Sequence, residues 1–284
     1  SLPLMKVSDY LTWLAEAILH QVVQLAWKPL VARHGRPHRE DGQPCSPDFV
    51  IVGYGKLGGI ELGHNSDLDL VFLHDADSAG NTDGDKPVSN EQFFARLGQR
   101  IIHILTTRTM SGQLYEVDSR LRPSGSAGLL VSSMRAFEKY QQDQAWTWEH
   151  QALVRARVVA GCARARERFN AIRQAVLCRP REIEPLRTEV LAMREKMVTH
   201  LGSGQRSERF HIKQDPGGIV DIEFMVQYGV LRWAAQHSDL TRYTDNVRLL
   251  ETLAVLELMP AHDAGLLREA YLAFRSAAHR LALR

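Results

Sequence analysis

The sequence predicts an α+β protein in which a small mixed sheet with flanking helices is followed by a mostly α-helical bundle domain. Three observations predict this fold. The apolar runs typical of buried strands fall between residues 48 and 130. Apolar positions at helical spacing fill most of the chain after that, and 284 residues are enough for two domains. We expect an N-terminal helix and linker at 1–47, an α/β core at 48–130 and a mostly helical domain at 131–284.

Composition and charge exclude several classes of protein. The formal net charge is +2, so a general nucleic-acid coat is not expected. The longest apolar runs are shorter than the roughly 18 residues that a membrane span needs, and the first residues lack a secretion signal. The three cysteines, Cys45, Cys162 and Cys178, share no metal-ligand spacing. An odd number of cysteines is typical of free thiols in a reducing compartment, so we expect a cytoplasmic protein.

The first part of the chain leads from a helix into a strand. Apolar residues recur at helical spacing over 8–33, and the glycine- and proline-rich segment 34–48 forms a loop. The continuous apolar run FVIVG at 49–53 predicts a buried strand. A tight glycine turn follows at 53–59, and the segment 58–64 is long enough for about two helical turns.

Two more strands and one helix complete the predicted core. DLDLVFLHD at 67–75 reads as the second strand, and QLYEVDSRL at 113–121 reads as the third because turn residues follow it. Between them, the apolar residues of 91–109 lie on one face of a helix.

Strands nearly vanish from the pattern in the rest of the chain. GSGQRSER at 202–209 is a loop candidate, and FHIKQ at 210–214 predicts one more short strand. The last helical pattern runs to Arg284 without a cap or breaker, so we expect a fragment cut from a longer protein at both ends. The predicted helices cover roughly 133–142, 144–160, 162–178, 183–201, 218–237, 244–258 and 262–284.

The glycine turn is compatible with three interpretations. Gly53-Tyr54-Gly55-Lys56-Leu57-Gly58 matches the GxGxxG dinucleotide fingerprint after a strand. A Rossmann unit, however, needs a longer crossover, and the later chain offers no alternating strands to extend a parallel sheet. A glycine turn without a ligand is the second interpretation. The third is a phosphate-binding turn, where glycines let the backbone approach an anion and the lysine adds a positive charge.

Asp67 and Asp69 are the most informative pair of residues. Side chains two apart in a strand point to the same face, so these carboxylates lie side by side while Leu68 and Leu70 point into the core. Carboxylates about 7 Å apart at Cα repel each other unless a cation lies between them. Mg²⁺ prefers such oxygens together with substrate phosphates. A solvated strand face is the alternative, but the nearby glycine turn favours a metal site.

Asp118 is the candidate third acid. In the strand predicted at 113–121 it shares a face with Glu116, Arg120 and Arg122. So many charges on one face are costly unless that face meets water or a charged ligand. A solvated face with cross-strand ion pairs is the alternative. A third carboxylate beside the first two would complete a two-metal site.

These motifs resemble the nucleotidyltransferase superfamily pattern G-S-x10-D-x-D with a later third acid. Gly55-Lys56 is followed by ten residues and then by Asp67-Leu68-Asp69, with Lys56 in place of the usual Ser. More narrowly, GYGKLGGIELGHNSDLDLVFLHD is similar to the glutamine synthetase adenylyltransferase family, also called glutamate–ammonia-ligase adenylyltransferase. The resemblance extends over most of 49–228 through YEVDSRLRPSG, WEHQALVRARVVAG and IKQDPGGIVDIEF.

The resemblance implies a nucleotidyltransferase-type sheet and an enzyme that transfers AMP from ATP to a tyrosine hydroxyl of glutamine synthetase, releasing pyrophosphate. The family carries two similar catalytic halves, one attaching AMP and the other removing it by phosphorolysis. The segment GYGKLGGIELGHNSDLDLVF looks more like the C-terminal, adenylylating half; the deadenylylating half is an alternative. A nucleotide-sensing or partner-docking domain without chemistry is another. Glutamine synthetase is the implied protein substrate, and a PII signal protein is an implied partner of the full-length enzyme.

The expected site combines the residue patterns with the resemblance. Asp67, Asp69 and Asp118 are the expected catalytic residues and ligands of Mg²⁺ or Mn²⁺, with Asp118 also a candidate base for the tyrosine hydroxyl. The roles of Asp221 and Glu223, which lie in a segment of the resemblance, stay open. The residues expected to bind the nucleotide are Gly53, Gly55, Lys56, Ser66, Arg120, Arg122 and Lys213.

Overall fold

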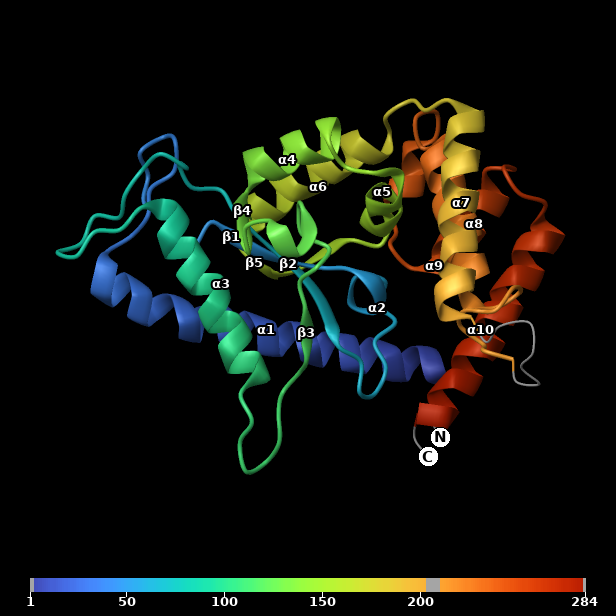
Figure 1. Cartoon of the computed structure of the whole chain (residues 1–284), viewed down its shortest axis with the longest axis horizontal. Coiled ribbons are helices and arrows are strands. Elements are labelled where there is room, and N and C mark those ends of the chain that lie inside the picture. Colours follow the sequence, from blue (N-terminus) through green and yellow to red (C-terminus); the bar gives the residue numbers. More distant parts are fainter. Residues whose placement is uncertain (1–2, 203–209, 283–284) are drawn as a thin grey trace. The chain divides into compact units, whose positions relative to one another are not determined.

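The computed structural model describes residues 3–202 and 210–282, which form two compact units (Figure 1). The first unit holds a small mixed sheet and the second is helical, so the α+β fold predicted from the sequence is confirmed. A short segment, 146–155, belongs to the second unit although the chain afterwards returns to the first. The first unit comprises residues 1–145 and 156–173, and the second comprises 146–155 and 174–284.

Five strands of the described chain form the sheet of the first unit. β1 (Phe49–Gly53) pairs antiparallel with β2 (Leu68–His74) on one side and with β5 (Arg157–Gly161) on the other. β2 also pairs in parallel with β3 (Val117–Asp118) near its start and with β4 (Val131–Ser133) near its end. β1 and β2 lie at the centre because nearly all of their residues are buried and apolar.

Two helices supply most of the remaining core of this unit. α1 (Leu4–His34) and α3 (Asn90–Thr106) pack against each other, and their apolar residues cluster with those of β1 and β2 (Figure 1). Trp27 of α1 meets Phe93 of α3 edge-on, with ring centroids 5.2 Å apart. The packing continues onto the sheet at the start of β1 and the end of β2, because Phe94 of α3 stacks on Phe49 and on His74.

The turn after β1 contains less helix than the sequence predicts. α2 (Gly55–Gly58) is a single turn, and the two helical turns expected at 58–64 are not formed, so that prediction is wrong. Ile60 adopts a positive φ of 56°, a left-handed conformation that ends a helix. The chain then reaches β2 through an irregular loop.

The third strand is shorter than the predicted 113–121. Only Val117 and Asp118 pair with β2. The backbone N–H of Arg120 donates to Oδ1 of Asp118 at 2.8 Å, a local turn that leads the chain out of the sheet. The prediction that Asp118 shares a strand face with residues 116, 120 and 122 is therefore wrong.

Two strands, β4 and β5, are missing from the sequence-based prediction. β5 begins within 144–160, where the sequence favours one helix. Instead, α5 (Thr147–Val154) ends and the chain enters the sheet. Both strands are short, and a short apolar run reads equally well as a helix segment or as a strand. Sheet pairing with β1 and β2 decides the outcome.

The remaining predicted helices are confirmed with small shifts of their ends. The strand predicted at 210–214 is wrong, because the N–H groups of Gln214 and Asp215 both donate to the carbonyl of His211 at 3.0 Å and form a turn. Most of the loop predicted at 202–209 lies outside the described residues. The helices are α4 (Met134–Asp143), α6 (Ala163–Leu177), α7 (Ile183–Leu201), α8 (Ile219–Trp233), α9 (Asn246–Val255) and α10 (Ala261–Ala282).

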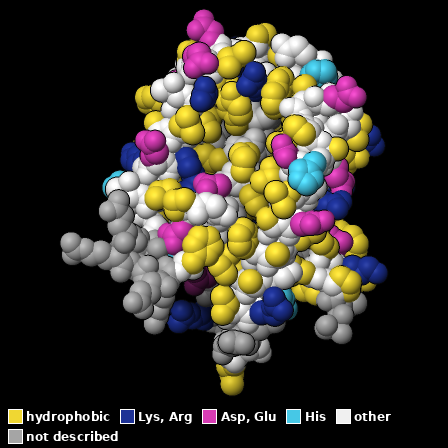
Figure 2. All heavy atoms as spheres, turned by 90° about the vertical axis from the view of Figure 1, so that its right-hand side faces the viewer, with side chains coloured by type: hydrophobic (Ala, Val, Ile, Leu, Met, Phe, Trp, Pro, Cys, Tyr) yellow, Lys and Arg dark blue, Asp and Glu magenta, His cyan; other side chains and the backbone are white. Residues whose placement is uncertain are grey.

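The surface of the protein is mixed in character. The face drawn in Figure 2 exposes apolar side chains among charges of both signs. Within the described ranges, no helix has both the length and the apolar character that crossing a membrane requires.

Candidate active site

Three carboxylates gather where β2 and β3 run side by side. Asp69 and Asp118 are paired residues of these parallel strands, and Asp67 directly precedes β2. One ligand oxygen from each of the three lies within 4.8 Å of the others. Leu68 and Leu70 are fully buried and alternate with the acids along the strand, as the period of a β-strand requires. Burial of these leucines therefore holds the two acids of β2 on the other face, next to Asp118.

This cluster is suited to a divalent cation. Three carboxylates at such short range repel one another, and a shared cation removes that repulsion. Hard cations such as Mg²⁺ and Mn²⁺ bind carboxylate oxygens. Among the residues that the structure describes, no second group of three or more histidine, cysteine or acidic side chains has this geometry. The donor set fits the metal expected from the sequence.

Arg120 already supplies one positive charge to the cluster. Its Nε lies 3.0 and 2.9 Å from the two oxygens of Asp118, and its Nη2 lies 2.5 Å from Oδ2. These hydrogen bonds hold the pKa of the Asp118 carboxyl below its usual range. The carboxylate is therefore ionised at neutral pH, which is the state that binds a metal.

The glycine turn touches this cluster directly. Tyr54, which follows β1, donates its backbone N–H to the carbonyl of Asp69 at 2.9 Å. Gly55 has a φ of +53°, and a Cβ at this position would lie 2.4 Å from Oδ2 of Asp69. Only glycine meets both conditions, a left-handed backbone and contact with a carboxylate. Lys56 is exposed on the following turn of helix.

Arg157 of β5 supports the turn from behind, and the sequence gives no signal for this role. Its Nε donates to the carbonyl of Gly58 and its Nη2 to that of Leu57, both at 3.2 Å. Nη2 also pairs with Glu16 of α1 at 2.5 Å. Because β5 is predicted as part of a helix, Arg157 cannot be placed beside the turn from sequence patterns alone.

Three further residues expected to bind the nucleotide lie in three different parts of the chain. Ser66 accepts the N–H of Gly63 at 3.1 Å and so shapes the loop before Asp67. Arg122 donates to the carbonyl and the hydroxyl of Ser119, at 2.9 and 3.0 Å, within the turn after β3. Lys213 is exposed in the helical unit. Their contribution to nucleotide binding stays a prediction.

A cavity of about 540 Å³ opens beside Asp67 in the first unit. Apolar side chains and polar groups line it in similar measure, so it suits a ligand with both characters. Its wall comes from α1, from the loop before β2 and from the segment before β3. The lining residues are Leu11, Leu62, Gly63, His64, Asn65, Ser66, Asp67, Gln113, Leu114, Tyr115 and Glu116.

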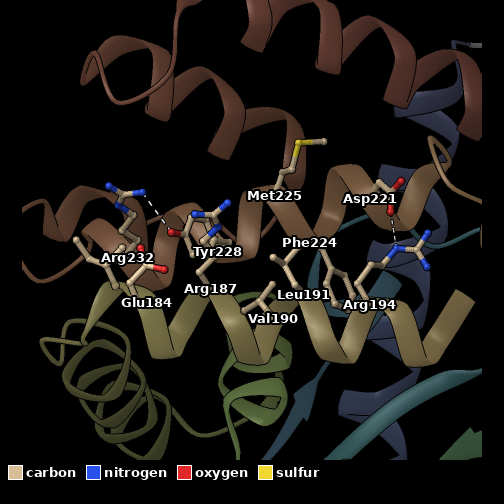
Figure 3. Close-up of a pocket in the computed structure, with 11 residues that line it drawn as sticks. Glu184, Arg187, Val190, Leu191, Arg194, Asp221, Phe224, Met225, Tyr228 and Arg232 are labelled. Atoms are coloured by element: carbon tan, nitrogen blue, oxygen red, sulfur yellow. Dashed lines mark hydrogen bonds and ion pairs between the residues drawn. The ribbon is translucent and has the colours of Figure 1, made fainter.

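Asp221 and Glu223 form ion pairs within the helical unit. Asp221 pairs with Arg194 of α7 beside a groove of about 780 Å³ between α7 and α8 (Figure 3). Glu223 accepts from Nη1 of Arg155 at 2.5 Å. These contacts join helices of the unit, so both acids have a structural explanation.

Comparison with known proteins identifies relatives over the whole chain. The family model described as glutamate–ammonia ligase adenylyltransferase matches residues 1–172, and that described as GlnD PII-uridylyltransferase matches residues 191–284. A bifunctional glutamine synthetase adenylyltransferase/adenylyl-removing enzyme of Pseudomonas aeruginosa is 61% identical over 100% of this chain and 30% of its own length.

Two further relatives carry the same name. The Pseudomonas putida protein is 62% identical over 100% of this chain and 30% of its own length, and the Thioalkalivibrio sulfidiphilus protein is 59% identical over 99% and 29%. The chain thus spans about 30% of the length of the relatives it matches. Since the first model covers well over half of the chain, the chain belongs to the glutamate–ammonia ligase adenylyltransferase family.

Proposed function

We propose that this chain transfers AMP from ATP to a tyrosine hydroxyl of glutamine synthetase and releases pyrophosphate. The observation that carries the proposal is the convergence of Asp67, Asp69 and Asp118 beside the glycine turn. The relatives' name supports the substrate, because it specifies adenylyl transfer to glutamine synthetase. The match of 191–284 to a PII-uridylyltransferase model supports a PII signal protein as a partner of the full-length enzyme.

Each part of the site has a task in this reaction. The three carboxylates would hold Mg²⁺ or Mn²⁺, which when bound stabilises the attacking and leaving oxygens of an in-line displacement. The turn at Gly53 and Gly55, with Lys56, would receive phosphate oxygens through backbone N–H groups and a positive charge. Asp118 is the candidate acceptor for the phenol proton, because it is a carboxylate within the cluster that would hold the metal.

The charges of the three acids favour a role in binding a metal ion and a nucleotide over a purely structural role. Three like charges cost stability when no cation is bound, and a docking surface has no need of them. Asp67 and Asp69 alternate with fully buried leucines, so the fold presents both carboxylates on one face. Arg120 pairs with Asp118 and offsets part of this charge.

Replacement of Asp67 and Asp69 by Asn tests the proposal. The double variant is expected to lose transfer of labelled AMP to glutamine synthetase while its thermal unfolding temperature stays close to that of the wild type. Asp143→Asn, an exposed acid at the end of α4, is the matched control and should retain full activity. Transfer by the purified double variant at the wild-type rate would contradict the assignment.

The direction of the reaction is tested separately. The relatives' name includes adenylyl removal, so modified and unmodified glutamine synthetase are each supplied with ATP or with phosphate. We expect AMP attachment driven by ATP, since GYGKLGGIELGHNSDLDLVF is more similar to the adenylylating half. Removal driven by phosphate, without attachment, would reverse the assignment. Binding of ATP without either reaction would indicate a sensing domain.

A further inference from the structure

We infer that Arg120 is a displaceable internal cation that competes with the metal ion for Asp118 and thereby sets the metal affinity of the cluster. This inference rests on the metal site of the proposed function but assigns Arg120 a task of its own. The sequence alone leaves open whether this residue contacts a phosphate or forms a salt bridge with a neighbouring acid. The geometry points first to the carboxylate.

Arg120 donates hydrogen bonds to both carboxylate oxygens of Asp118. Its backbone N–H lies 2.8 Å from Oδ1, its Nε 3.0 and 2.9 Å from Oδ1 and Oδ2, and its Nη2 2.5 Å from Oδ2. A carboxylate offers about four lone-pair sites, and three N–H groups of Arg120, one of them shared between the two oxygens, occupy most of these sites. A metal ion that binds Asp118 therefore displaces some of the hydrogen bonds from Arg120. Repulsion between the metal ion and the guanidinium favours complete displacement of the guanidinium.

The arginine is placed so that it can leave. Its side chain is 77% exposed, whereas that of Asp118 is 19% exposed. Within residues 3–202 and 210–282, Asp118 is the sole hydrogen-bond and ion-pair partner of the Arg120 side chain, with Asp69 and Asp67 acting on it through longer-range attraction. Water therefore reaches most of the guanidinium and can replace its hydrogen bonds when it leaves the carboxylate. Because most of its side chain is already exposed, little packing is lost when the guanidinium turns into solvent.

Arg120 therefore contributes differently from a residue that only binds phosphate. A phosphate contact has no effect on the binding of a metal ion alone. A competing cation weakens metal binding in the absence of nucleotide, and its removal strengthens it. A residue with a structural role would change stability instead.

The test measures binding of Mn²⁺ alone, without nucleotide, from the electron paramagnetic resonance signal of free Mn²⁺. Arg120→Gln is expected to bind Mn²⁺ roughly tenfold more tightly than the wild type, because one competing charge at contact distance is removed. Arg120→Lys keeps the positive charge but loses the two-donor contact of the guanidinium. Its Mn²⁺ affinity is expected to lie between those of the wild type and Arg120→Gln. Arg100→Gln, on the exposed face of α3, removes one charge elsewhere and should leave the affinity unchanged.

Three results would overturn the inference. Equal or weaker Mn²⁺ binding by Arg120→Gln would show that the arginine does not compete. An equal gain in Arg100→Gln would show a general charge effect. Failure of the wild type and all three variants to bind Mn²⁺ would remove the metal site of the proposed function together with this inference, and so is distinct from the first two. Thermal unfolding of each variant identifies a protein that has lost its fold.

Discussion

Gly55 lies where the backbone of the glycine turn meets the carboxylate of Asp69. Two independent constraints act on this residue, a φ of +53° and an Oδ2 only 2.4 Å from the place of a Cβ. A left-handed conformation costs a residue other than glycine about 1–2 kcal/mol, whereas the clash would move a carboxylate of the cluster. The sequence identifies the glycine through its motif, but the contact with Asp69 depends on how β1 and β2 pair.

We predict that Gly55→Ala loses AMP transfer by about a hundredfold, because displacement of a catalytic group by about 1 Å has effects of that size. Gly42→Ala is the matched control, since Gly42 also has a positive φ of 78° but no atom within 4 Å of its Cβ position. Both variants should lose about 1–2 kcal/mol of unfolding free energy. Similar activity in the two variants would contradict the role of the clash.

His74, at the end of β2, makes the stability of the first unit depend on pH. The side chain stacks on Phe94 with ring centroids 4.4 Å apart, and burial lowers its pKa to about 4. The folded protein therefore holds His74 neutral, while the unfolded chain takes up a proton near pH 6.5. Its contribution to stability is complete above that pH and is lost as the pH falls from 6.5 towards 4.

We predict that this histidine alone lowers the unfolding free energy by about 2 kcal/mol between pH 7 and pH 5. Urea unfolding at the two pH values measures the difference. His74→Gln, whose amide oxygen can still accept the N–H that Ala76 donates at 3.2 Å, should lose this part of the pH dependence. An identical pH dependence in the variant would show that His74 does not titrate as described.

At the scale of elements, long apolar patterns are predictable and short pairings are not. β1 is predicted residue for residue, because FVIVG is a continuous buried run. β4 and β5 are missed because each has only three to five residues, and their assignment depends on partners far away in the chain. The extent of β3 is misjudged because Arg120 turns back on Asp118, a local contact that alternation does not reveal.

The elements of the helical unit are joined by a buried ion pair. Arg155, after α5, is 6% exposed and Glu223 of α8 is 19% exposed. Removal of one partner leaves a buried charge without compensation, which typically costs 3–5 kcal/mol, whereas exposed pairs contribute about 1 kcal/mol or less. Sequence patterns leave the role of Glu223 open, because its partner lies 68 positions away in the chain.

We predict that Glu223→Ala lowers the unfolding free energy of the helical unit by about 3 kcal/mol. The exposed pair of Glu251 and Arg268, at 3.3 Å and about half exposed, is the matched control, and Glu251→Ala should cost less than about 1 kcal/mol. Urea denaturation followed by far-UV circular dichroism measures both. Equal losses in the two variants would contradict the assignment of the buried pair.

At the scale of the whole chain, the acids, the glycine turn and the cavity of the candidate site lie within the first unit. The three acids, the glycine turn and the cavity beside Asp67 all come from residues 1–145, and Arg157 adds support from the return of the chain into the sheet. The acids and the turn are recognisable in the sequence because they lie in short continuous motifs that resemble those of a known family. The cavity is not recognisable, since three separate segments form it.

The family relationship supports adenylyl transfer as the chemistry of this site. The chain spans about 30% of the length of its relatives, which are named for both attachment and removal of AMP. The proposed activity therefore depends on whether this one set of carboxylates binds metal and nucleotide together. The most direct measurement is a crystal structure of the chain soaked with ATP and Mn²⁺, with Mn²⁺ located by its anomalous scattering.

The account predicts anomalous peaks at roughly 2.1 Å from carboxylate oxygens of Asp67, Asp69 and Asp118, the distance typical of Mg²⁺-type coordination. The triphosphate should lie against the turn at 53–59, and the guanidinium of Arg120 should have left Asp118. Mn²⁺ and ATP bound elsewhere on the protein, with the three acids free of metal, would contradict the central claim.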